Sequence, residues 1–290
     1  MAVLARSEWQ GCSLRHQSRA DALTAAHRER AVQGRAHPVA DFLFVYYNNS
    51  PARLRRWHPG PGVALLDAAD AEQAGWRHYR TDEDGSVRLD VDSFVAQRGS
   101  TVRFVRELME ATLSRPAFTG CFGLHEWAMV YRLDQEEVRH DRWPLRLGRA
   151  GTDEVVEAHQ IRCSHFDAFR FFTPEASGRN ALQPSRESQV TMEQPGCLHA
   201  GMDVYKWCFK LAPAVPGDLT LDAFELAADI RTLDMRASPY DLVDLGLEPI
   251  RIETPAGKRE YAEAQRGFTT RSNALRRRLL EVCDALAVAA

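Results

Sequence analysis

Three segments in which a histidine stands close to a carboxylate lie between residues 125 and 203. The three pairs are His125 with Glu126, His165 with Asp167, and His199 with Asp203. An imidazole and a carboxylate together can hold a metal ion, fix each other's orientation through a hydrogen bond, or move a proton. The pairs therefore predict that the chemistry of this protein is carried by the stretch that contains them.

The last pair has the spacing of a helical ligand set. His199 and Asp203 are four residues apart, which places both on one face of a predicted helix. Glu225 and Asp229 repeat this spacing on the next helix, and antiparallel packing of the two helices would bring the four groups together in the interior. Such a centre would bind divalent iron, manganese or zinc. Its expected ligands are His125, His165, His199, Asp203, Glu225 and Asp229.

The same helices also have a purely structural interpretation. Glu225 and Asp229 then lie on the solvent face and pair with neighbours such as Arg231. His199 is in that case an ordinary core side chain with a satisfied ring. The sequence leaves both interpretations open.

Further polar and aromatic residues could form a pocket with these groups. Asp234, Arg236 and Tyr240 stand at or just after the end of a predicted helix, where side chains are held beside a cleft or form a helix-ending charge network. Glu126 follows His125 and precedes Trp127, and a carboxylate buried among aromatic rings has a raised pKa suited to general acid or base catalysis.

Helical periodicity dominates the elements that must position these residues. Helices are expected at 7–33, from 38 through the aromatic run 42–47, and at 92–114, 122–133, 195–211, 219–236 and 257–287, with Asp92 as the N-cap of the third. Short strands are expected at 63–66, 76–80, 87–89, 145–147 and 160–163, with a hairpin turn at Asp84-Gly85. The fold class is therefore mainly α, with a small antiparallel β element.

No linker-like run divides the 290 residues, so the chain is expected to form a single domain. Residues 1–115 would supply the N-terminal helices and the small hairpin. Residues 116–245 would form the active-site core, including a polar, irregular stretch at 173–193. Residues 246–290 would add a C-terminal strand and a long helix.

Charge and composition narrow the classes of partner. The 37 Lys and Arg against 40 Asp and Glu give a net charge of −3, so charge gives DNA little support as a partner. No apolar run is long enough for a membrane span, and the six cysteines show no Cys-x-x-Cys pair, which together favour a cytoplasmic protein with reduced thiols. Phosphate-binding loops, dinucleotide fingerprints and Gly-x-Ser-x-Gly elbows are missing from the sequence.

Six stretches match a known family. They are HPV at 37–39 with DFLF at 41–44, LRRWHPG at 54–60, FGLHEWAMVYR at 122–132, QPGCLHA at 194–200, DMRASPYDL at 234–242 and IETP at 252–255. In these stretches the chain resembles actinobacterial proteins labelled 3-methyladenine DNA glycosylase. The resemblance implies a DNA-repair hydrolase that flips an alkylated purine nucleotide from the duplex and breaks its N-glycosidic bond with the help of a carboxylate, without a metal or other cofactor.

Two enzymatic hypotheses and one binding hypothesis follow. Under the glycosylase hypothesis the expected catalytic carboxylates are Asp234, Glu126 and Asp203, and the expected substrate contacts are Trp127, Tyr205, Arg236 and Tyr240. The alternative is a metal-dependent oxygenase or hydrolase that acts on a small molecule through the His and carboxylate ligands. A non-enzymatic protein that captures a ligand in an aromatic pocket is the third.

Overall fold

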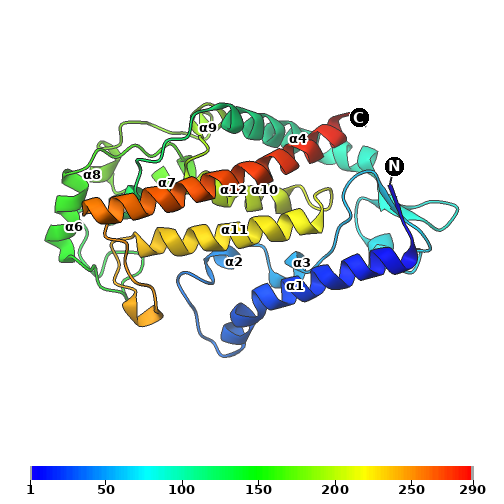
Figure 1. Cartoon of the computed structure of the whole chain (residues 1–290), viewed down its shortest axis with the longest axis horizontal. Coiled ribbons are helices and arrows are strands. Elements are labelled where there is room, and N and C mark those ends of the chain that lie inside the picture. Colours follow the sequence, from blue (N-terminus) through cyan, green and yellow to red (C-terminus); the bar gives the residue numbers. More distant parts are fainter. Residues whose placement is uncertain (1, 289–290) are drawn as a thin grey trace. The chain divides into compact units, whose positions relative to one another are not determined.

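Helices form 56% of the protein and strands 6%, so the mainly helical fold class is confirmed. The structure, a computed structural model, describes residues 2–288 (Figure 1). The described residues group into two compact units. The first takes in the chain up to Glu110, residues 203–227 and the residues from 274 onward, and the second contains residues 111–202 and 228–273.

The first unit contains the sheet and the N-terminal helices. Its elements in chain order are β1 (Ala2–Leu4), α1 (Arg6–Val32), α2 (Phe42–Tyr46), α3 (Pro51–Leu54), β2 (Val63–Leu65), the 3-10 helix η1 (Glu72–Gly75), β3 (Tyr79–Thr81), β4 (Val87–Leu89) and most of α4 (Val91–Ser114). Parts of α10 (Leu198–Lys210), α11 (Gly217–Arg236) and α12 (Pro255–Val288) complete it.

The four strands form one sheet in the order β1-β2-β4-β3. β3 and β4 are antiparallel on either side of the turn at Asp84-Gly85, which confirms the predicted hairpin. The predicted antiparallel pairing is present between β2, β4 and β3, whereas β2 is parallel to β1, so the sheet is mixed. The reason is the long connection through α1, because parallel neighbours need a crossover of this kind.

An apolar cluster holds α1 against the sheet. Its buried members are Trp9, Trp57, Leu65, Ala68 and Val87. The indole N–H of Trp9 donates to the carbonyl of Leu66 at 2.9 Å, which satisfies the one polar group that this side chain brings into the core. Burial of apolar area therefore fixes the N-terminal helix without leaving an unpaired donor.

The start of α4 differs by two residues from the sequence expectation. The side chain of Asp90 accepts a hydrogen bond from the backbone N–H of Ser93 at 3.0 Å, so Asp90 is the residue that caps the helix. Asp92 lies in the first turn, where its charge favours the helix dipole but its carboxylate does not cap. The helix then continues past Gly99 to Ser114.

The second unit is built from short helices and the ends of longer ones. Its elements are α5 (Leu124–Ala128), α6 (Gly148–Glu157), α7 (Phe166–Phe169), α8 (Pro174–Ser177), α9 (Gln189–Met192), the 3-10 helix η2 (Val243–Leu245) and the remaining parts of α4, α10, α11 and α12. The long C-terminal helices were predicted at the right places. The stretch 173–193 contains α8 and α9.

Four local predictions in this unit are wrong. The helix expected at 122–133 is reduced to α5, followed by turns. The strands expected at 145–147 and 160–163 amount to single bridges, Leu145 with Tyr240 and Ile161 with Asn180. The expected strand after residue 246 does not form, because the N–H of Ile250 donates to the carbonyl of Arg236 at the end of α11 and the next residues close local turns.

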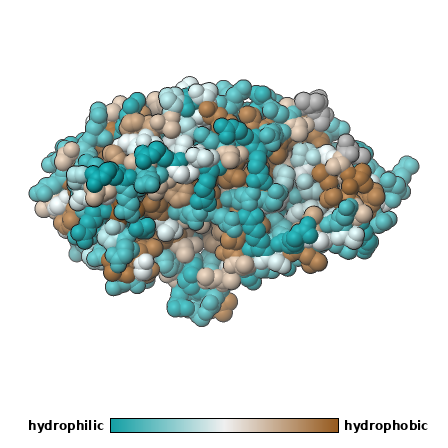
Figure 2. Space-filling model, viewed as in Figure 1, coloured by the Kyte–Doolittle hydropathy of each residue, from teal (hydrophilic) through white to brown (hydrophobic). Residues whose placement is uncertain are grey.

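Within residues 2–288 the helices include no segment that is both long and apolar enough to span a bilayer. Figure 2 shows hydrophilic side chains over most of the face in view, with hydrophobic side chains in separate patches. Large apolar side chains with high exposure, such as Leu14, Val32 and Val45, are far apart in the sequence, as is usual for single surface residues.

His58 is a partly buried titratable group next to the apolar cluster of the first unit. Its Nδ1 lies 3.1 Å from the hydroxyl oxygen of Tyr79. Burial, together with the nearby His16 and Arg56, lowers the pKa of His58 from 6.5 to about 3. The folded chain therefore holds this imidazole neutral at neutral pH.

This pKa predicts an acid-sensitive stability. Between pH 6.5 and about 3 the unfolded chain binds a proton at His58 that the folded chain does not. Acidification through that window should lower the free energy of unfolding by up to about 1.4 kcal/mol per pH unit. The measurement is urea unfolding of the wild type and of His58→Gln between about pH 7.5 and 5.5. The wild type should lose stability relative to the variant, and a pH-independent difference between the two would contradict this assignment.

Candidate metal centre

Three helices of the second unit each place one polar side chain at a common point. His125 lies in α5, His199 in the first turn of α10, and Asp234 in the last turn of α11. The close approach of α10 to α11 depends on Gly201, because a Cβ atom there would lie only 2.9 Å from Cδ1 of Ile230. A larger residue at 201 would force the helix that carries His199 away from the helix that carries Asp234.

The position of α5 is fixed by Trp127. Its indole N–H donates at 2.9 Å to the carbonyl of Ala237, the residue directly after α11. The guanidinium of Arg146 lies 5.0 Å from the centre of the ring, and the ring itself is fully buried. Since His125 is only two residues away on the same short helix, this anchor also sets the place of His125 relative to Asp234.

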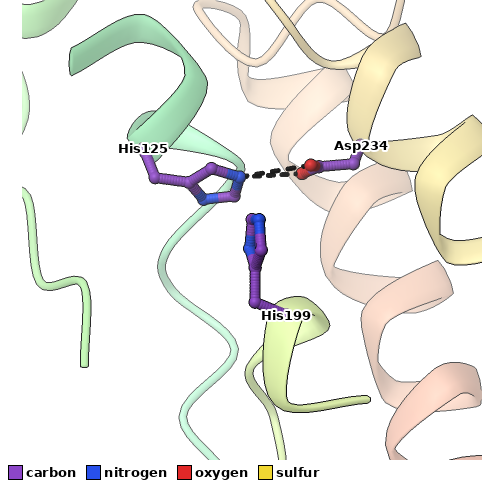
Figure 3. Close-up of side chains that lie close together, drawn as sticks. All are labelled: His125, His199 and Asp234. Carbon is purple, nitrogen blue, oxygen red and sulfur yellow. Dashed lines mark hydrogen bonds and ion pairs between the residues drawn. The ribbon is translucent and has the colours of Figure 1, made fainter. Parts of the chain in front are cut away.

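The ligand-capable atoms of His125, His199 and Asp234 lie within 4.8 Å of one another, and all three side chains are buried. Nε2 of His125 is hydrogen-bonded to Oδ2 of Asp234 at 3.2 Å and lies 3.1 Å from Oδ1. The ring of His199 stands edge-on to that of His125, with 4.4 Å between the ring centroids. Figure 3 shows the His199 ring pointing toward the space between the other two side chains.

A buried arginine accompanies the two carboxylates of the site. Nη1 of Arg231 donates to Oε1 of Glu126 at 2.8 Å and lies 3.5 Å from Oδ2 of Asp234. Burial acts to raise the pKa of Glu126, but Arg231 and His125 outweigh it and hold the pKa below its ordinary value. The expectation that aromatic surroundings raise the pKa of Glu126 is therefore wrong, because it left out the guanidinium.

The two histidines have opposite pKa shifts. Burial acts to lower the pKa of His125, but Asp234 and Glu126 outweigh burial and raise it above its ordinary value. Burial and the neighbouring His125 lower the pKa of His199 well below its ordinary value. His199 is therefore a neutral imidazole at neutral pH, which is the form that binds a metal ion.

His165 is the outer neighbour of His199. The centroids of the two rings are 5.3 Å apart. Nε2 of His165 lies 3.5 Å from Oε1 of Glu193, and both side chains are almost fully buried. The side-chain amide of Gln189 donates to the same oxygen at 2.6 Å. His165 thus has a carboxylate partner of its own beside the His125, His199 and Asp234 group.

A cavity of about 20 Å³ adjoins His125 and His199. Its lining includes Cys121, Cys163 and Cys197. Burial raises the pKa of all three thiols, that of Cys163 to about 12. The thiols are therefore protonated at neutral pH, and a thiol in this form is a poor nucleophile. The volume is enough for one water-sized molecule.

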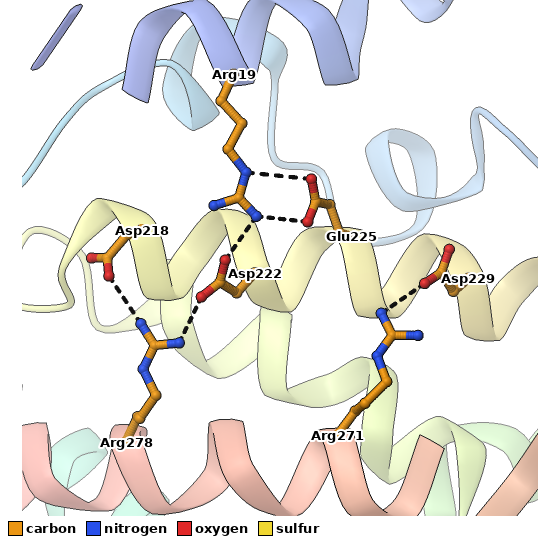
Figure 4. Close-up of polar contacts among 7 residues, drawn as sticks. All are labelled: Arg19, Asp218, Asp222, Glu225, Asp229, Arg271 and Arg278. Atoms are coloured by element: carbon orange, nitrogen blue, oxygen red, sulfur yellow. Dashed lines mark hydrogen bonds and ion pairs between the residues drawn. The ribbon is translucent and has the colours of Figure 1, made fainter. Parts of the chain in front are cut away.

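Glu225 and Asp229 do not join this group. Arg19 of α1 donates to both carboxylate oxygens of Glu225, at 3.3 and 2.6 Å, and Arg271 of α12 donates to Asp229 at 2.7 Å (Figure 4). The two acidic side chains are 40% and 54% exposed. The expected interior site with ligands from Glu225 and Asp229 is therefore wrong, because these carboxylates pair with arginines at the surface.

Asp203, expected both as a ligand and as a catalytic carboxylate, belongs to the first unit. The hydroxyl of Tyr47 donates to its Oδ1 at 2.9 Å, and the ammonium group of Lys206 pairs with its Oδ2. All three side chains are buried. The charge of Asp203 is thus compensated by a lysine three residues along the same helix.

The residues expected to contact a substrate make structural contacts. Trp127 anchors α5, and Tyr205 is a buried side chain whose hydroxyl accepts a hydrogen bond from a side-chain amide at 2.8 Å. Tyr240 is buried with its ring centroid 5.2 Å from that of His140. Arg236 donates to a backbone carbonyl at 2.8 Å.

Arg231 is the member of the site that the sequence interpretation placed elsewhere. Arg231 was expected as a surface partner of Glu225 or Asp229. Its side chain is instead only 3% exposed and faces Glu126 and Asp234. The spacing of three residues between Arg231 and Asp234 is a local signal that the two share a helix face. Pairing with Glu126 spans 105 residues and has no local signature.

Comparison with protein-family models, with curated proteins and with solved structures found no match for this chain. The resemblance to proteins labelled as glycosylases therefore stays a prediction. Fold and site together define a mainly helical protein with a buried group of two histidines and one aspartate.

The charge arrangement predicts unequal effects of two carboxylate substitutions. Glu126→Gln leaves Arg231 buried with a weakened counter-charge, which typically costs about 3–5 kcal/mol. Asp229→Asn breaks only the exposed pair with Arg271, which is worth at most about 1 kcal/mol. Urea unfolding of the two variants measures the difference. Equal losses of stability would show that the charge of Glu126 is not needed to compensate Arg231.

Proposed function

We propose that His125, His199 and Asp234 bind one divalent metal ion and that the protein is a metal-dependent enzyme acting on a small molecule. The observation that carries the proposal is the convergence of three buried ligand atoms within 4.8 Å of one another. Three groups of this kind, drawn from three helices and shielded from solvent, are unusual without a structural or catalytic purpose.

The donor set suits a borderline transition metal. Two imidazoles and one carboxylate form the ligand set of non-haem iron(II) oxygenases, and zinc hydrolases use closely related sets. Iron and zinc are therefore the expected metals.

The few donors around Asp234 support the same proposal. Both of its carboxylate oxygens lie 3.1–3.2 Å from the same atom, Nε2 of His125, which has one N–H to donate. A buried carboxylate with so few donors has lone pairs left for a cation. Bonds of about 2.0–2.2 Å place neighbouring ligand atoms about 3–3.5 Å apart. His125 and Asp234 already have this separation, and the ligand atom of His199 lies within 4.8 Å of both.

The surrounding residues have definable roles in such a centre. Arg231 and Glu126 neutralise each other beside Asp234 and keep its carboxylate oriented toward His125. Neutral His199 offers a free lone pair at neutral pH. A metal ion there would supply Lewis-acid or redox chemistry, and the cavity of about 20 Å³ leaves room for one water-sized ligand.

Metal analysis of the purified protein tests the proposal. After loading with iron(II) or zinc and gel filtration, the wild type should retain about one metal per chain, because three protein ligands hold it. His199→Ala and Asp234→Asn should each lose most of that metal, since loss of one of three ligands weakens binding by at least about tenfold. Glu225→Gln and Asp229→Asn are matched controls on the same helix as Asp234 and should retain it.

Two results would contradict the proposal. One is a wild-type protein that retains no metal after loading while remaining folded. The other is retention that is unchanged in both ligand variants. Circular dichroism of each variant separates loss of the site from loss of the fold.

The glycosylase hypothesis makes a different prediction for Asp234, as the carboxylate that supports base release. The metal proposal makes Asp234 a ligand, whereas base hydrolysis needs a carboxylate and no metal. Purified protein incubated with methylated duplex DNA in the presence of EDTA should therefore release no free base. Release that survives EDTA and disappears in Asp234→Asn would support base hydrolysis and contradict the metal-dependent function.

A further inference from the structure

The first unit contains a cavity of about 650 Å³, which is within the usual size range of small-molecule sites. It lies among the end of α3 and the residues after it, the segment between η1 and β3, the first half of α4, the end of α10 and the connection to α11. Five cationic side chains line it, and no aspartate or glutamate does so within the part of the chain that the structure describes. The five are Arg53, Arg56, Arg77, Arg98 and Lys210.

None of these five cations makes an ion pair with a carboxylate among residues 2–288, whereas several arginines close to them in the sequence do. Arg55, between two of them in the sequence, pairs with Asp21 at 3.1 Å, and Arg88 pairs with Asp82 at 2.6 Å. A chain with a net charge of −3 thus leaves a group of positive charges uncompensated around one cavity. Like charges gathered in this way repel, and a bound anion would relieve the repulsion.

Neighbouring contacts hold two of the cations in place. Arg98 donates to the backbone carbonyl of Lys210, and Arg77 donates to the side chain of Gln97. Each of these bonds occupies one N–H group, and a guanidinium has five. The remaining donors are available to a ligand that carries several acceptor oxygens.

The aromatic lining indicates a ligand with an organic part. The guanidinium of Arg56 lies 5.4 Å from the centre of the Trp76 ring, and the His58 ring centroid lies 5.1 Å from that of Trp76. Phe209 also lines the cavity. His58 stays neutral because burial lowers its pKa to about 3, so it adds ring surface and no charge. Flat rings beside guanidinium groups suit a planar base with attached phosphates.

We propose that this cavity binds a small molecule that carries two or more phosphate groups on a planar ring system, of the nucleoside diphosphate or triphosphate class. Arginines surrounding a bounded cavity favour a compact ligand over an extended polymer. A nucleic acid backbone would need cations spread along a face, which the net charge of −3 does not favour. The proposal concerns residues of the first unit and is independent of the metal centre in the second.

Titration calorimetry of the full chain with ADP tests the proposal, with inorganic tripolyphosphate as a probe of the phosphate subsite alone. Both should bind at moderate salt, and ADP should bind more tightly because of its ring. Arg56→Ala and Arg77→Ala should each weaken ADP binding by about tenfold or more, because each removes a charge-assisted contact. Arg55→Ala is the matched control, since Arg55 is adjacent in sequence but paired with Asp21, and it should change binding by less than about twofold.

Three outcomes would overturn the proposal. The first is no binding of ADP or tripolyphosphate at millimolar concentration by the folded wild type. The second is equal weakening by Arg55→Ala and Arg56→Ala, which would indicate general surface charge. The third is a single-stranded oligonucleotide that binds at least about a hundredfold more tightly than ADP and depends on the same arginines, which would make the occupant a nucleic acid. Thermal melting of each variant confirms that a loss of binding is not a loss of fold.

Discussion

Burial of the Asp234 carboxylate is the constraint on which the candidate site depends. Asp234 is 0% exposed, and Glu126 is buried close by, so two negative charges lie in the interior of one unit. Two buried carboxylates are tolerated only when cations or hydrogen bonds compensate them. Arg231 and a His125 with a raised pKa supply this compensation, and Trp127 together with the small residue Gly201 brings the three helices close enough for it to work.

The buried charges of this group are compensated unequally, and this inequality makes the group able to bind a cation. Glu126 has a direct partner in Arg231, whereas both oxygens of Asp234 lie beside the same atom, Nε2 of His125, and His199 is held neutral. A fully satisfied network would have a structural role alone. Here a carboxylate oxygen and neutral imidazole are left facing the same space, which is the condition for binding a divalent cation.

Much of the fold could be predicted from the sequence, because it depends on local signals. Helical periodicity located α1, α4, α10, α11 and α12, and Asp84-Gly85 located the hairpin. For the candidate site, His125 and His199 were predicted as metal ligands and Asp234 as a catalytic carboxylate, but their partners were not predicted. Glu225 and Asp229 have the spacing of a ligand pair on one helix face. Their side chains point to the surface, however, where they pair with Arg19 and Arg271. Contacts such as Arg231 with Glu126 join distant segments, and local pattern does not encode them.

The most direct test of the metal centre is anomalous X-ray diffraction from crystals grown with iron(II) or zinc, recorded on both sides of the metal absorption edge. The account predicts one strong anomalous peak at about 2.0–2.2 Å from Nε2 of His125, a ring nitrogen of His199 and a carboxylate oxygen of Asp234. A peak at the cysteines of the adjoining cavity, or a hydrogen bond between His125 and Asp234 that persists with no peak beside it in a metal-soaked crystal, would contradict it.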